Sequence, residues 1–519
     1  MIKVRNAVIL AAGAGTRFVP LSLEQPKGLF EVNGEKLIDR QIVQLQEAGI
    51  KDITVVLGYK KEMLYYLEEK YGAKLVFNPY FNTKNNIESL CLAKNFIGDT
   101  YICSCDDYFL ENPFRQEEPY SFYAGLQVSC KTNEMFVDVD ADNRITSMEK
   151  GRNSGKILLG HSFWAKDFSE KFFELVKKNQ DSGKYNNSFW EVIVKDNLDL
   201  FPPFFFKEYP SEFIHEFDYF EELREFDKSY INNTNSKILS NIKTVFHCND
   251  SDIVSFRCIN EGLTNTSFIF RVFGCDYIYR HPGEGTERII NRKNEKSSLD
   301  IAKSLGIDPT YIYMDENEGW KISKYVPAFR EPDYDSFADS KKVVEVIRNL
   351  HDSGIKVDYG LRPWEDACLM EGFLKQSKPG CFKDYEQLKN KVEILYRQTL
   401  GDGVSLCFCH GDTYKHNWMF KPDGSVVLID WEYSGMSDPG IDVGYYIVDA
   451  MYDIDTAKVI IKEYLKDQWS PKKEFHFLAY VAIIAYYWFV WALYRELCGA
   501  DMGESLVNWR EMAERYTMI

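Results

Sequence analysis

The first hundred residues alternate between short apolar runs and stretches with helical spacing. Apolar runs occupy residues 7–12, 52–58 and 74–78, and the segments between them, residues 38–49 and 61–72, place apolar residues at intervals of three and four. A later apolar run, TYICSCDDY, contains two acids near its end. This alternation predicts an α/β domain with a mostly parallel sheet and helices on both faces.

The pattern changes after residue 227. The fifteen residues 227–241 are polar and rich in Asn and Ser, which is typical of a linker or an exposed connecting helix. Residues 256–283 have the pattern of strands around a glycine turn, and helical periodicity dominates after about residue 338. We therefore predict an α/β domain (residues 1–227), a linker (228–241) and a two-lobed α+β domain (242–519), with lobes at about 242–327 and 328–519.

The most apolar segment lies near the C-terminus. Residues 475–494 carry no formal charge and end in YYWFVWALY. About twenty apolar residues can cross a bilayer, but Trp and Tyr prefer membrane interfaces, and here they fill the middle and the C-terminal half of the run. We therefore predict no membrane span, and instead a helix buried in a large helical lobe.

Composition narrows the possible partners. The net charge of −17 argues against a nucleic-acid partner held by phosphate contacts, although local Lys, Arg and Mg²⁺ can still bind small phosphorylated substrates. The 12 cysteines show no metal-binding CxxC spacing, which is typical of reduced thiols in a cytoplasmic protein. The run at residues 7–12 is too short for a signal peptide. The sequence leaves the oligomeric state open.

The first chemical motif, LAAGAGTRFVPLSLEQPKGLF, begins within the first apolar run. Glycines at a turn after a strand let backbone N–H groups face a phosphate, and Arg17 and Lys27 add positive charge. Phe18 stands where the dinucleotide-binding fingerprint has its third glycine, and Pro20 interrupts the helix that should follow. An NAD site is therefore disfavoured.

This motif resembles the signature of nucleotidyltransferases that activate sugar phosphates and phospho-alcohols, LAAGxGTR followed by PK. The resemblance covers about residues 1–225, and the segment KNNIESL is similar to the bacterial phosphocholine cytidylyltransferase type. It implies a Rossmann-like domain in which Arg17 and Lys27 stabilise the charge that develops when an acceptor phosphate attacks the α-phosphorus of CTP. It also implies a CTP site formed by Ala12, Gly13, Gly15, Asn86 and Ser89.

The chemistry of this family requires Mg²⁺ on a CTP phosphate, and hard cations prefer carboxylate oxygens. Asp106 and Asp218 are the candidate ligands, each at the end of a strand-like segment. Asp107 is an alternative to Asp106. The other interpretation is that these acids only cap a loop.

The acceptor site of this domain carries a weaker signal. A quaternary ammonium group needs an aromatic face and an acid. Phe136, Trp190 and Glu216 are the candidates for binding phosphocholine, although Trp190 fits a core position equally well.

A second constellation lies in CHGDTYKHNWMF and LIDWEYSGMSDPG. Asp412, Asn417 and Asp430 have the order of a kinase catalytic loop, in which the first Asp takes the substrate hydroxyl proton and the other two hold Mg²⁺. HGD in place of HRD and IDWE in place of DFG resemble the choline and aminoglycoside phosphotransferases. The resemblance covers about residues 240–519 and implies a protein-kinase-like (choline kinase) fold.

The kinase resemblance also implies an ATP site upstream. Thr264 and Asn265 would lie in the turn that covers the nucleotide. Arg280 would contact the α- and β-phosphates, with Glu295 on the following helix as its partner. Residues 321–327 would form the hinge between the lobes.

Two rings of the C-terminal apolar run have a possible use beyond packing. Trp488 and Trp491 are three residues apart and share a helical face, where two indoles can enclose a trimethylammonium group. The resemblance adds Tyr433 and Glu432 to this choline site, with Trp509 as a weaker candidate. The alternative is that both Trp residues belong to the core.

Together the two resemblances imply a cytoplasmic bifunctional transferase. It would phosphorylate choline with ATP and convert phosphocholine with CTP to CDP-choline, using Mg²⁺ at both sites. Ethanolamine in place of choline is the alternative substrate. A membrane-tethered or scaffolding protein with an inactive kinase lobe is the rival class, and retention of Asp412, Asn417 and Asp430 argues against it.

Overall fold

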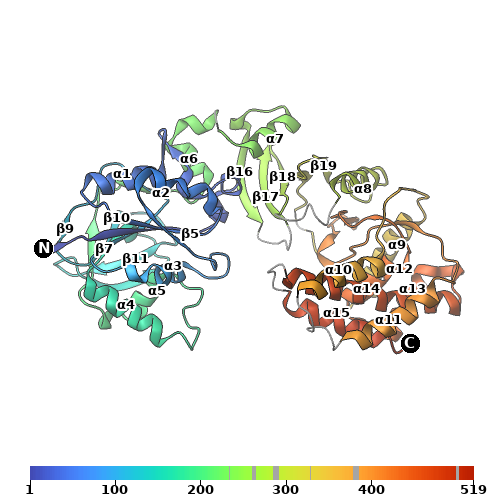
Figure 1. The fold of residues 1–519 in the computed structure, drawn as a ribbon. Coiled ribbons are helices and arrows are strands. Elements are labelled where there is room, and N and C mark those ends of the chain that lie inside the picture. Colours follow the sequence, from blue (N-terminus) through green and yellow to red (C-terminus); the bar gives the residue numbers. More distant parts are fainter. Residues whose placement is uncertain (233, 260–264, 284–290, 328, 378–384, 498–501) are drawn as a thin grey trace. The chain divides into compact units, whose positions relative to one another are not determined.

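The computed structural model describes the whole chain except residues 233, 260–264, 284–290, 328, 378–384 and 498–501 (Figure 1). Its contacts define two compact units. The first contains residues 1–260 and 268–275, and the second contains residues 261–267 and 276–519. The first unit therefore extends beyond the predicted linker at residues 228–241, and the domain boundaries given above stay predictions.

A nine-stranded sheet forms the centre of the first unit. Its main path has the order β12-β11-β13-β7-β2-β5-β6, with β10 beside β13 and β14 beside β10. The strands are β2 (Asn6–Ala11), β5 (Ile53–Leu57), β6 (Lys74–Phe77), β7 (Thr100–Ser104), β10 (Phe122–Val128), β11 (Met135–Val139), β12 (Ile145–Lys150), β13 (Gly155–Trp164) and β14 (Phe205–Glu208).

The two halves of this sheet differ in strand direction. Strands β7, β2, β5 and β6 pair in parallel, as the alternating pattern predicts. Strands β11, β12 and β13 pair antiparallel, because the loops between them are too short to hold a crossover helix. The prediction of a mostly parallel sheet therefore holds for only one half.

Helices cover both faces of the parallel half. In β2, Ala7 and Ile9 belong to one core cluster and Val8 to another, so both faces of the strand are buried. Ile42 of α1 joins the first cluster and Leu90 of α3 joins the second. The helices of this unit are α1 (Leu37–Glu47), α2 (Tyr66–Tyr71), α3 (Asn86–Leu92), α4 (Lys166–Lys178), α5 (Trp190–Asp196), α6 (Phe220–Phe226) and α7 (Lys237–Phe246).

Short strand pairs lie outside the main sheet. Strand β8 (Asp107–Phe109) pairs antiparallel with β15 (Ile214–Glu216), and this pairing brings Asp107 opposite Glu216. The other pairs are β1 (Ile2–Lys3) with β9 (Glu117–Glu118), and β3 (Glu31–Val32) with β4 (Glu35–Lys36).

A five-stranded sheet follows along the chain in the order β16-β17-β18-β20-β19. Its strands are β16 (Ile253–Ile259), β17 (Thr266–Val272), β18 (Cys275–His281), β19 (Tyr311–Met314) and β20 (Lys321–Lys324). Strand β20 pairs antiparallel with both β18 and β19. Helix α8 (Arg292–Ser304) lies between β18 and β19 in the sequence.

Residues 337–516 of the second unit are mainly helical. Its helices are α9 (Phe337–His351), α10 (Pro363–Ser377), α11 (Glu386–Thr399), α12 (Gly440–Asp449), α13 (Ile454–Leu465), α14 (Pro471–Leu497) and α15 (Gly503–Tyr516). Two small hairpin-like pairs interrupt them: β21 (Cys407–Cys409) with β24 (Gly435–Ser437), and β22 (Trp418–Phe420) with β23 (Val426–Leu428).

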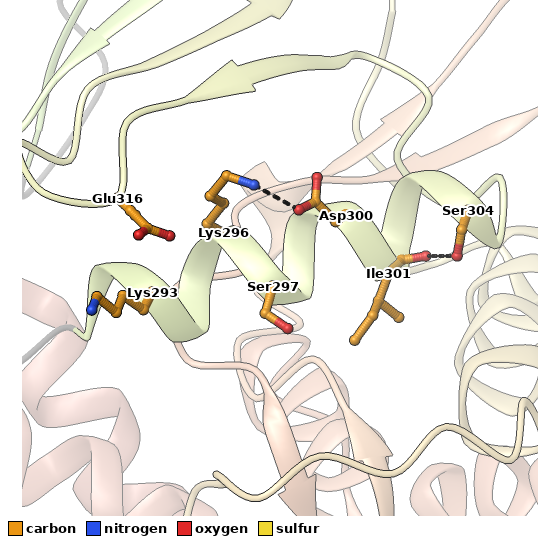
Figure 2. Close-up of a pocket in the computed structure, with 7 residues that line it drawn as sticks. All are labelled: Lys293, Lys296, Ser297, Asp300, Ile301, Ser304 and Glu316. Carbon is orange, nitrogen blue, oxygen red and sulfur yellow. Dashed lines mark hydrogen bonds and ion pairs between the residues drawn. The ribbon is translucent and has the colours of Figure 1, made fainter.

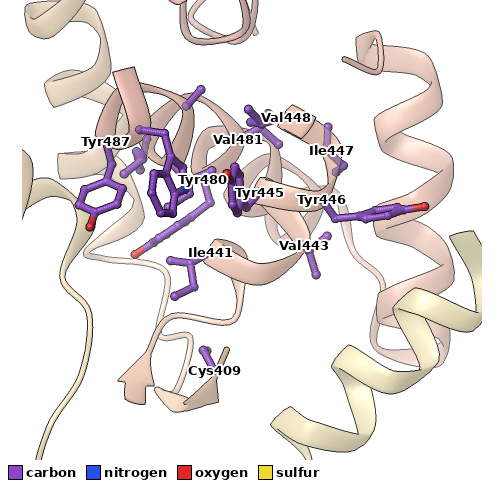
Figure 3. Packing of buried hydrophobic residues seen from close by; sticks show 14 of the residues in the cluster. Cys409, Ile441, Val443, Tyr445, Tyr446, Ile447, Val448, Tyr480, Val481 and Tyr487 are labelled. Atoms are coloured by element: carbon purple, nitrogen blue, oxygen red, sulfur yellow. The ribbon is translucent and has the colours of Figure 1, made fainter. Parts of the chain in front are cut away.

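Helix α14 is the central helix of this part. It contacts α10, α11, α12, α13 and α15, and Figure 3 shows Tyr480 and Val481 of α14 beside Tyr445 and Val448 of α12. The helix is long and apolar enough to cross a membrane, and its most apolar 18 residues have a mean hydropathy of 1.7, but 89% of this window is buried inside the protein. A buried packing role therefore accounts for the apolar run.

Candidate active sites

Lys27 is the centre of a charged cluster in the first unit. Its Nζ lies 3.1 Å from Asp106 Oδ2 and 3.3 Å from Asp218 Oδ1, and it donates a hydrogen bond to the Phe217 carbonyl at 3.0 Å. Arg17 Nη2 lies 2.9 Å from the same Asp218 oxygen. The structure thus brings together four predicted site residues, although Lys27 and Asp218 are 191 positions apart in the sequence.

The glycine loop is shaped around Lys27. Gly15 has φ of 60°, and a Cβ added there would lie 2.8 Å from Lys27 Cγ. A side chain at Gly15 would therefore force the Lys27 stem to move. Among the described residues, no atom lies within 4 Å of a Cβ added at Gly13, so the backbone there is open to a ligand. Ala12 accepts the Tyr59 N–H at 3.0 Å, which ties the loop to the segment after β5.

The charges at this cluster distinguish Asp106 from Asp107. Burial lowers the pKa of Lys27, but Asp106 and Asp218 raise it by more, so that the ammonium stays protonated. Asp107 is buried, and burial followed by the nearby Asp106 raises its pKa well above the usual range. Its Oδ2 has no hydrogen-bond partner in the described part of the chain. Asp106 and Asp218 therefore share the position beside Lys27, and their oxygens fit a hard cation such as Mg²⁺.

The predicted base-binding residues lie in the first turn of α3 and near it. Asn86 accepts the backbone N–H of Trp190 at 2.8 Å through Oδ1, which joins α3 to the start of α5. Ser89 is buried, and its Oγ accepts a hydrogen bond from Asn78 Nδ2 at 3.0 Å. Both side chains are therefore held in fixed orientations.

The candidate acceptor residues are only partly assembled. Trp190 stacks on Tyr123 with ring centroids 5.2 Å apart and an interplanar angle of 14°. Tyr123 donates a hydrogen bond to Glu191 at 3.0 Å, and desolvation raises the pKa of Glu191 to about 7. Phe136, by contrast, is fully buried in a core cluster of the sheet. Tyr123 and Glu191 belong to no recognisable motif, so the sequence alone did not indicate them.

The second site centres on Asp412. Asn417 Nδ2 donates to Asp412 Oδ2 at 3.0 Å and to its carbonyl at 2.9 Å, which fixes the carboxylate. Burial raises the pKa of Asp412 well above the usual range, and the nearby Asp430 and Glu432 raise it further. The carboxylate is therefore a stronger proton acceptor than an exposed one.

The buried carboxylate of Asp442 holds the loop that contains His410, Gly411 and Asp412. Asp442 accepts the backbone N–H groups of His410 and Gly411 at 2.8 and 2.7 Å, and His351 Nε2 lies 2.9 Å from it. Gly411 has φ of 85°, and a Cβ there would lie 2.5 Å from the Tyr433 carbonyl oxygen. Only glycine therefore fits between Asp442 and Tyr433 without a backbone shift.

The predicted nucleotide residues Arg280 of β18 and Glu295 of α8 lie together, beside the predicted metal ligand Asp430, which follows β23. Arg280 lies 2.6 Å from Glu295, 3.3 Å from Asp430 and 3.6 Å from Glu432. Lys321 of β20, which the sequence analysis treated only as part of a hinge, lies 3.6 Å from Asp430. The carboxylates of Glu295, Asp430 and Glu432 lie within 4.8 Å of one another, so this group also fits a divalent cation.

Three predicted residues need separate mention. Thr264 lies outside the described residues. Asn265 is described, and its side chain accepts the Gly283 N–H at 3.3 Å. Glu432 was assigned to choline, but its carboxylate faces Arg280 and Arg292, with Arg292 at 3.8 Å.

The predicted aromatic residues lie together. The ring centroid of Trp488 is 5.2 Å from that of Trp491, 5.5 Å from Tyr433 and 5.8 Å from Trp509. Tyr445, which the sequence analysis missed, stacks on Trp488 at 4.8 Å. Trp488 and Trp491 are buried, and neither indole N–H has a partner among the described residues. The rings form one cluster at the end of α14 nearest Tyr433.

The hollow drawn in Figure 2 is a different feature. It has a volume of about 390 Å³ and lies along α8, where Lys296 forms an ion pair with Asp300 at 2.8 Å. Its lining contains none of the residues assigned to ATP, choline or metal. We therefore do not treat it as an active site.

Comparisons with known proteins match the two regions separately. The family described as "MobA-like NTP transferase domain" matches residues 7–116, and the family described as "Choline/ethanolamine kinase" matches residues 239–487. The first match includes the glycine loop and Lys27, and the second includes Asp412, Asn417 and Asp430.

Individual relatives follow the same division. A choline-phosphate cytidylyltransferase of Streptococcus pneumoniae is 36% identical over 43% of this chain and 97% of its own length. A 2-aminoethylphosphonate cytidylyltransferase of Lancefieldella rimae is 34% identical over 44% of this chain and 93% of its own length. The crystal structure of choline kinase LicA from Streptococcus pneumoniae is 26% identical, with a TM-score of 0.48, and the match covers 54% of this chain and 97% of that one.

Proposed function

Because the chain belongs to the choline-phosphate cytidylyltransferase family and continues into a choline/ethanolamine kinase domain, we propose that it carries out two consecutive transfers on choline. Both families are transferases. The kinase domain phosphorylates choline with ATP, and the N-terminal domain then transfers CMP from CTP to phosphocholine, which gives CDP-choline and pyrophosphate. The observation that carries the proposal is that one chain holds both catalytic constellations, Lys27 with Asp106 and Asp218, and Asp412 with Asn417 and Asp430.

The kinase step uses Asp412 as the proton acceptor. The choline hydroxyl attacks the γ-phosphorus of ATP while Asp412 takes its proton, and the bond to the β,γ-bridging oxygen breaks so that ADP leaves. Asn417 holds the Asp412 carboxylate in place. Arg280, paired with Glu295, binds the phosphates of ATP. Asn417 and Asp430 would hold Mg²⁺, which neutralises phosphate charge when it is bound.

The cytidylyl step requires no covalent enzyme intermediate. A phosphate oxygen of phosphocholine attacks the α-phosphorus of CTP, and pyrophosphate leaves. Lys27 and Arg17 stabilise the negative charge that develops, since both cations lie within 3.3 Å of the same oxygen of Asp218. Asp106 and Asp218 would hold Mg²⁺ here, and Asn86 and Ser89 bind the nucleoside.

Choline recognition rests on the aromatic cluster. A trimethylammonium group is attracted to the faces of aromatic rings, most strongly to Trp. Tyr433, Trp488 and Trp491 supply three rings. The ring centroids of Tyr433 and Trp491 lie 5.5 and 5.2 Å from that of Trp488. In the N-terminal domain, Trp190 and Tyr123 with Glu191 and Glu216 are the proposed counterpart for phosphocholine. The proposed location is the cytoplasm, where choline, ATP and CTP are the small-molecule partners.

Ethanolamine is the second candidate substrate, because the matching kinase family includes both alcohols in its description. Steady-state kinetics of the kinase reaction with choline and with ethanolamine separate the two. We expect a higher kcat/KM for choline, since its three N-methyl groups bring more apolar surface to the aromatic rings than the NH₃⁺ group of ethanolamine. A kcat/KM that favours ethanolamine would overturn the choice of choline. The same comparison of phosphocholine with phosphoethanolamine and 2-aminoethylphosphonate tests the second reaction.

A further inference from the structure

Residues 239–260 belong to the kinase family by sequence but to the first compact unit by their contacts. The match begins at residue 239, but the first compact unit includes everything up to Asn260. Strand β16 and all of α7 except its first two residues, Lys237 and Ile238, therefore belong to the kinase region by sequence, although both elements pack within the first unit. Strand β16 contacts both α6 and the short helix η1 (Thr16–Phe18), which contains Arg17.

A row of buried rings connects β16 to the glycine loop. Phe18 lies 6.3 Å from Phe220 between ring centroids, and Phe220 lies 5.5 Å from Phe256 of β16. Phe18 and Phe220 are fully buried, and Phe256 is 5% exposed. Phe18 follows Arg17 directly, and Phe220 comes two residues after Asp218. Each ring thus supports a residue of the Lys27 cluster.

Polar contacts fix α6 to the same strand. Arg224 donates hydrogen bonds to the carbonyls of Ile253 at 2.5 Å and Asp250 at 3.0 Å, and its guanidinium lies 4.3 Å from the centre of the Phe220 ring. Glu221 accepts the Phe256 N–H at 2.9 Å. Charged hydrogen bonds of this kind are stronger than neutral ones and set the distance between helix and strand.

Helix α7 holds the glycine loop from a second direction. Glu24, which lies between Arg17 and Lys27 in the sequence, accepts the Ile238 N–H at 2.8 Å. Ile238 is the second residue of α7, so the Glu24 carboxylate lies at the positive end of the helix dipole. Ile238, Leu239 and Ile242 of α7 are buried, so this helix is an integral part of the unit.

We propose that α7 and β16 position Arg17 and Asp218 for cytidylyl transfer, with Phe256 and Glu24 as positioning residues. The N-terminal reaction then depends on a segment that belongs to the kinase family by sequence. This inference rests on the proposed transfer of CMP to phosphocholine. Because a displacement of about 1 Å in a catalytic group can cost on the order of 100-fold in rate, loss of one supporting ring has a measurable effect.

The test compares three variants of the full chain in cytidylyl transfer to supplied phosphocholine. Phe256→Ala removes the supporting ring, Phe256→Leu keeps most of the apolar volume, and Val254→Ala alters a side chain of the same strand that is 38% exposed. We expect Phe256→Ala to lower kcat about 10- to 100-fold, with little change in KM for CTP. Phe256→Leu restores most of the rate, and Val254→Ala keeps it.

Two results would overturn this inference. One is a wild-type kcat in Phe256→Ala. The other is an equal loss in Phe256→Ala of cytidylyl transfer and choline phosphorylation together with a lower unfolding temperature, which indicates general destabilisation. If Phe256→Ala does not fold, Glu24→Met decides instead, since it keeps a similar side-chain length but removes the oxygens that accept the Ile238 N–H: a reduced kcat supports the inference and an unchanged kcat contradicts it. A wild-type chain without cytidylyl transfer would contradict the proposed function, whereas an active wild type with unaffected variants contradicts only this inference.

Discussion

The two active sites are held in place by different means. In the first, Lys27 is both the proposed catalytic cation and the contact that joins Asp106 to Asp218. In the second, Asp442 anchors the loop through the backbone N–H groups of His410 and Gly411, while the proposed proton acceptor is a different residue, Asp412. One residue, Lys27, is therefore assigned both roles in the first site, whereas Asp442 and Asp412 divide them in the second. Substitution of Lys27 should change the structure and the rate of the first site together, whereas in the second site the loop and the proton acceptor can be changed separately.

The largest expected effect is at the catalytic Asp of the second site. Asp412→Asn keeps the shape of the side chain but removes the proton acceptor, so ATP-dependent choline phosphorylation should fall by about 10²- to 10⁴-fold. Cytidylyl transfer to supplied phosphocholine serves as the internal control and should stay unchanged. Loss of both reactions in a folded variant would contradict two separate sites.

The matching change in the first site is Lys27→Met. It removes the cation that stabilises the developing charge and leaves Asp106 and Asp218 without their shared partner. We expect cytidylyl transfer to fall on the order of 10²- to 10³-fold, measured as pyrophosphate release from CTP. Choline phosphorylation should persist at the wild-type rate, and a parallel fall in both rates would count against the assignment.

Asp442→Ala breaks the anchor without touching a substrate. Removal of one partner from a buried, hydrogen-bonded charge pair typically costs about 3–5 kcal/mol, so the denaturant midpoint of the second unit should fall strongly. Asp455→Ala is the control, because its side chain is 97% exposed. If both variants unfolded at the same denaturant concentration, Asp442 would not be the anchor.

The smallest effect is expected in the aromatic cluster. Trp488→Ala or Trp491→Ala should weaken choline binding by about 1–2 kcal/mol per ring. Relative to the wild type, the KM for choline should therefore increase more than the KM for ATP. Because both rings are buried, the variants also lose packing, and the ratio of the two KM values isolates the choline effect. An unchanged KM for choline would indicate that the two Trp residues have only a structural role.

Much of the fold could be predicted because burial imposes a pattern on the sequence. Strands β2, β5 and β7 are buried on both faces and appear as continuous apolar runs. The predicted fold classes, a Rossmann-like nucleotidyltransferase domain followed by a kinase-like domain, are confirmed. The antiparallel half of the sheet was missed, because strand direction depends on loop length and pairing partner and not on the pattern of a single strand.

The sites show the same limit. Lys27, Asp412 and Asn417 were found because their motifs have fixed spacing. Lys321 and Tyr123 were not identified, since each reaches its site through strand pairing or a single ring contact. Glu432 was grouped with its neighbour Tyr433, but both lie in a turn, where the sequence does not show which way each side chain points, and only the fold shows that Glu432 faces Arg280.

The central claim is that this chain carries out two transfers in sequence, and ³¹P NMR of the wild-type chain with choline, ATP, CTP and Mg²⁺ tests it most directly. We predict that a phosphocholine signal rises first and is then replaced by the CDP-choline signals as pyrophosphate accumulates. Without CTP the reaction should stop at phosphocholine, and without ATP it should not start. CDP-choline that forms without ATP, or phosphocholine that accumulates and is never consumed in the presence of CTP, would contradict the account.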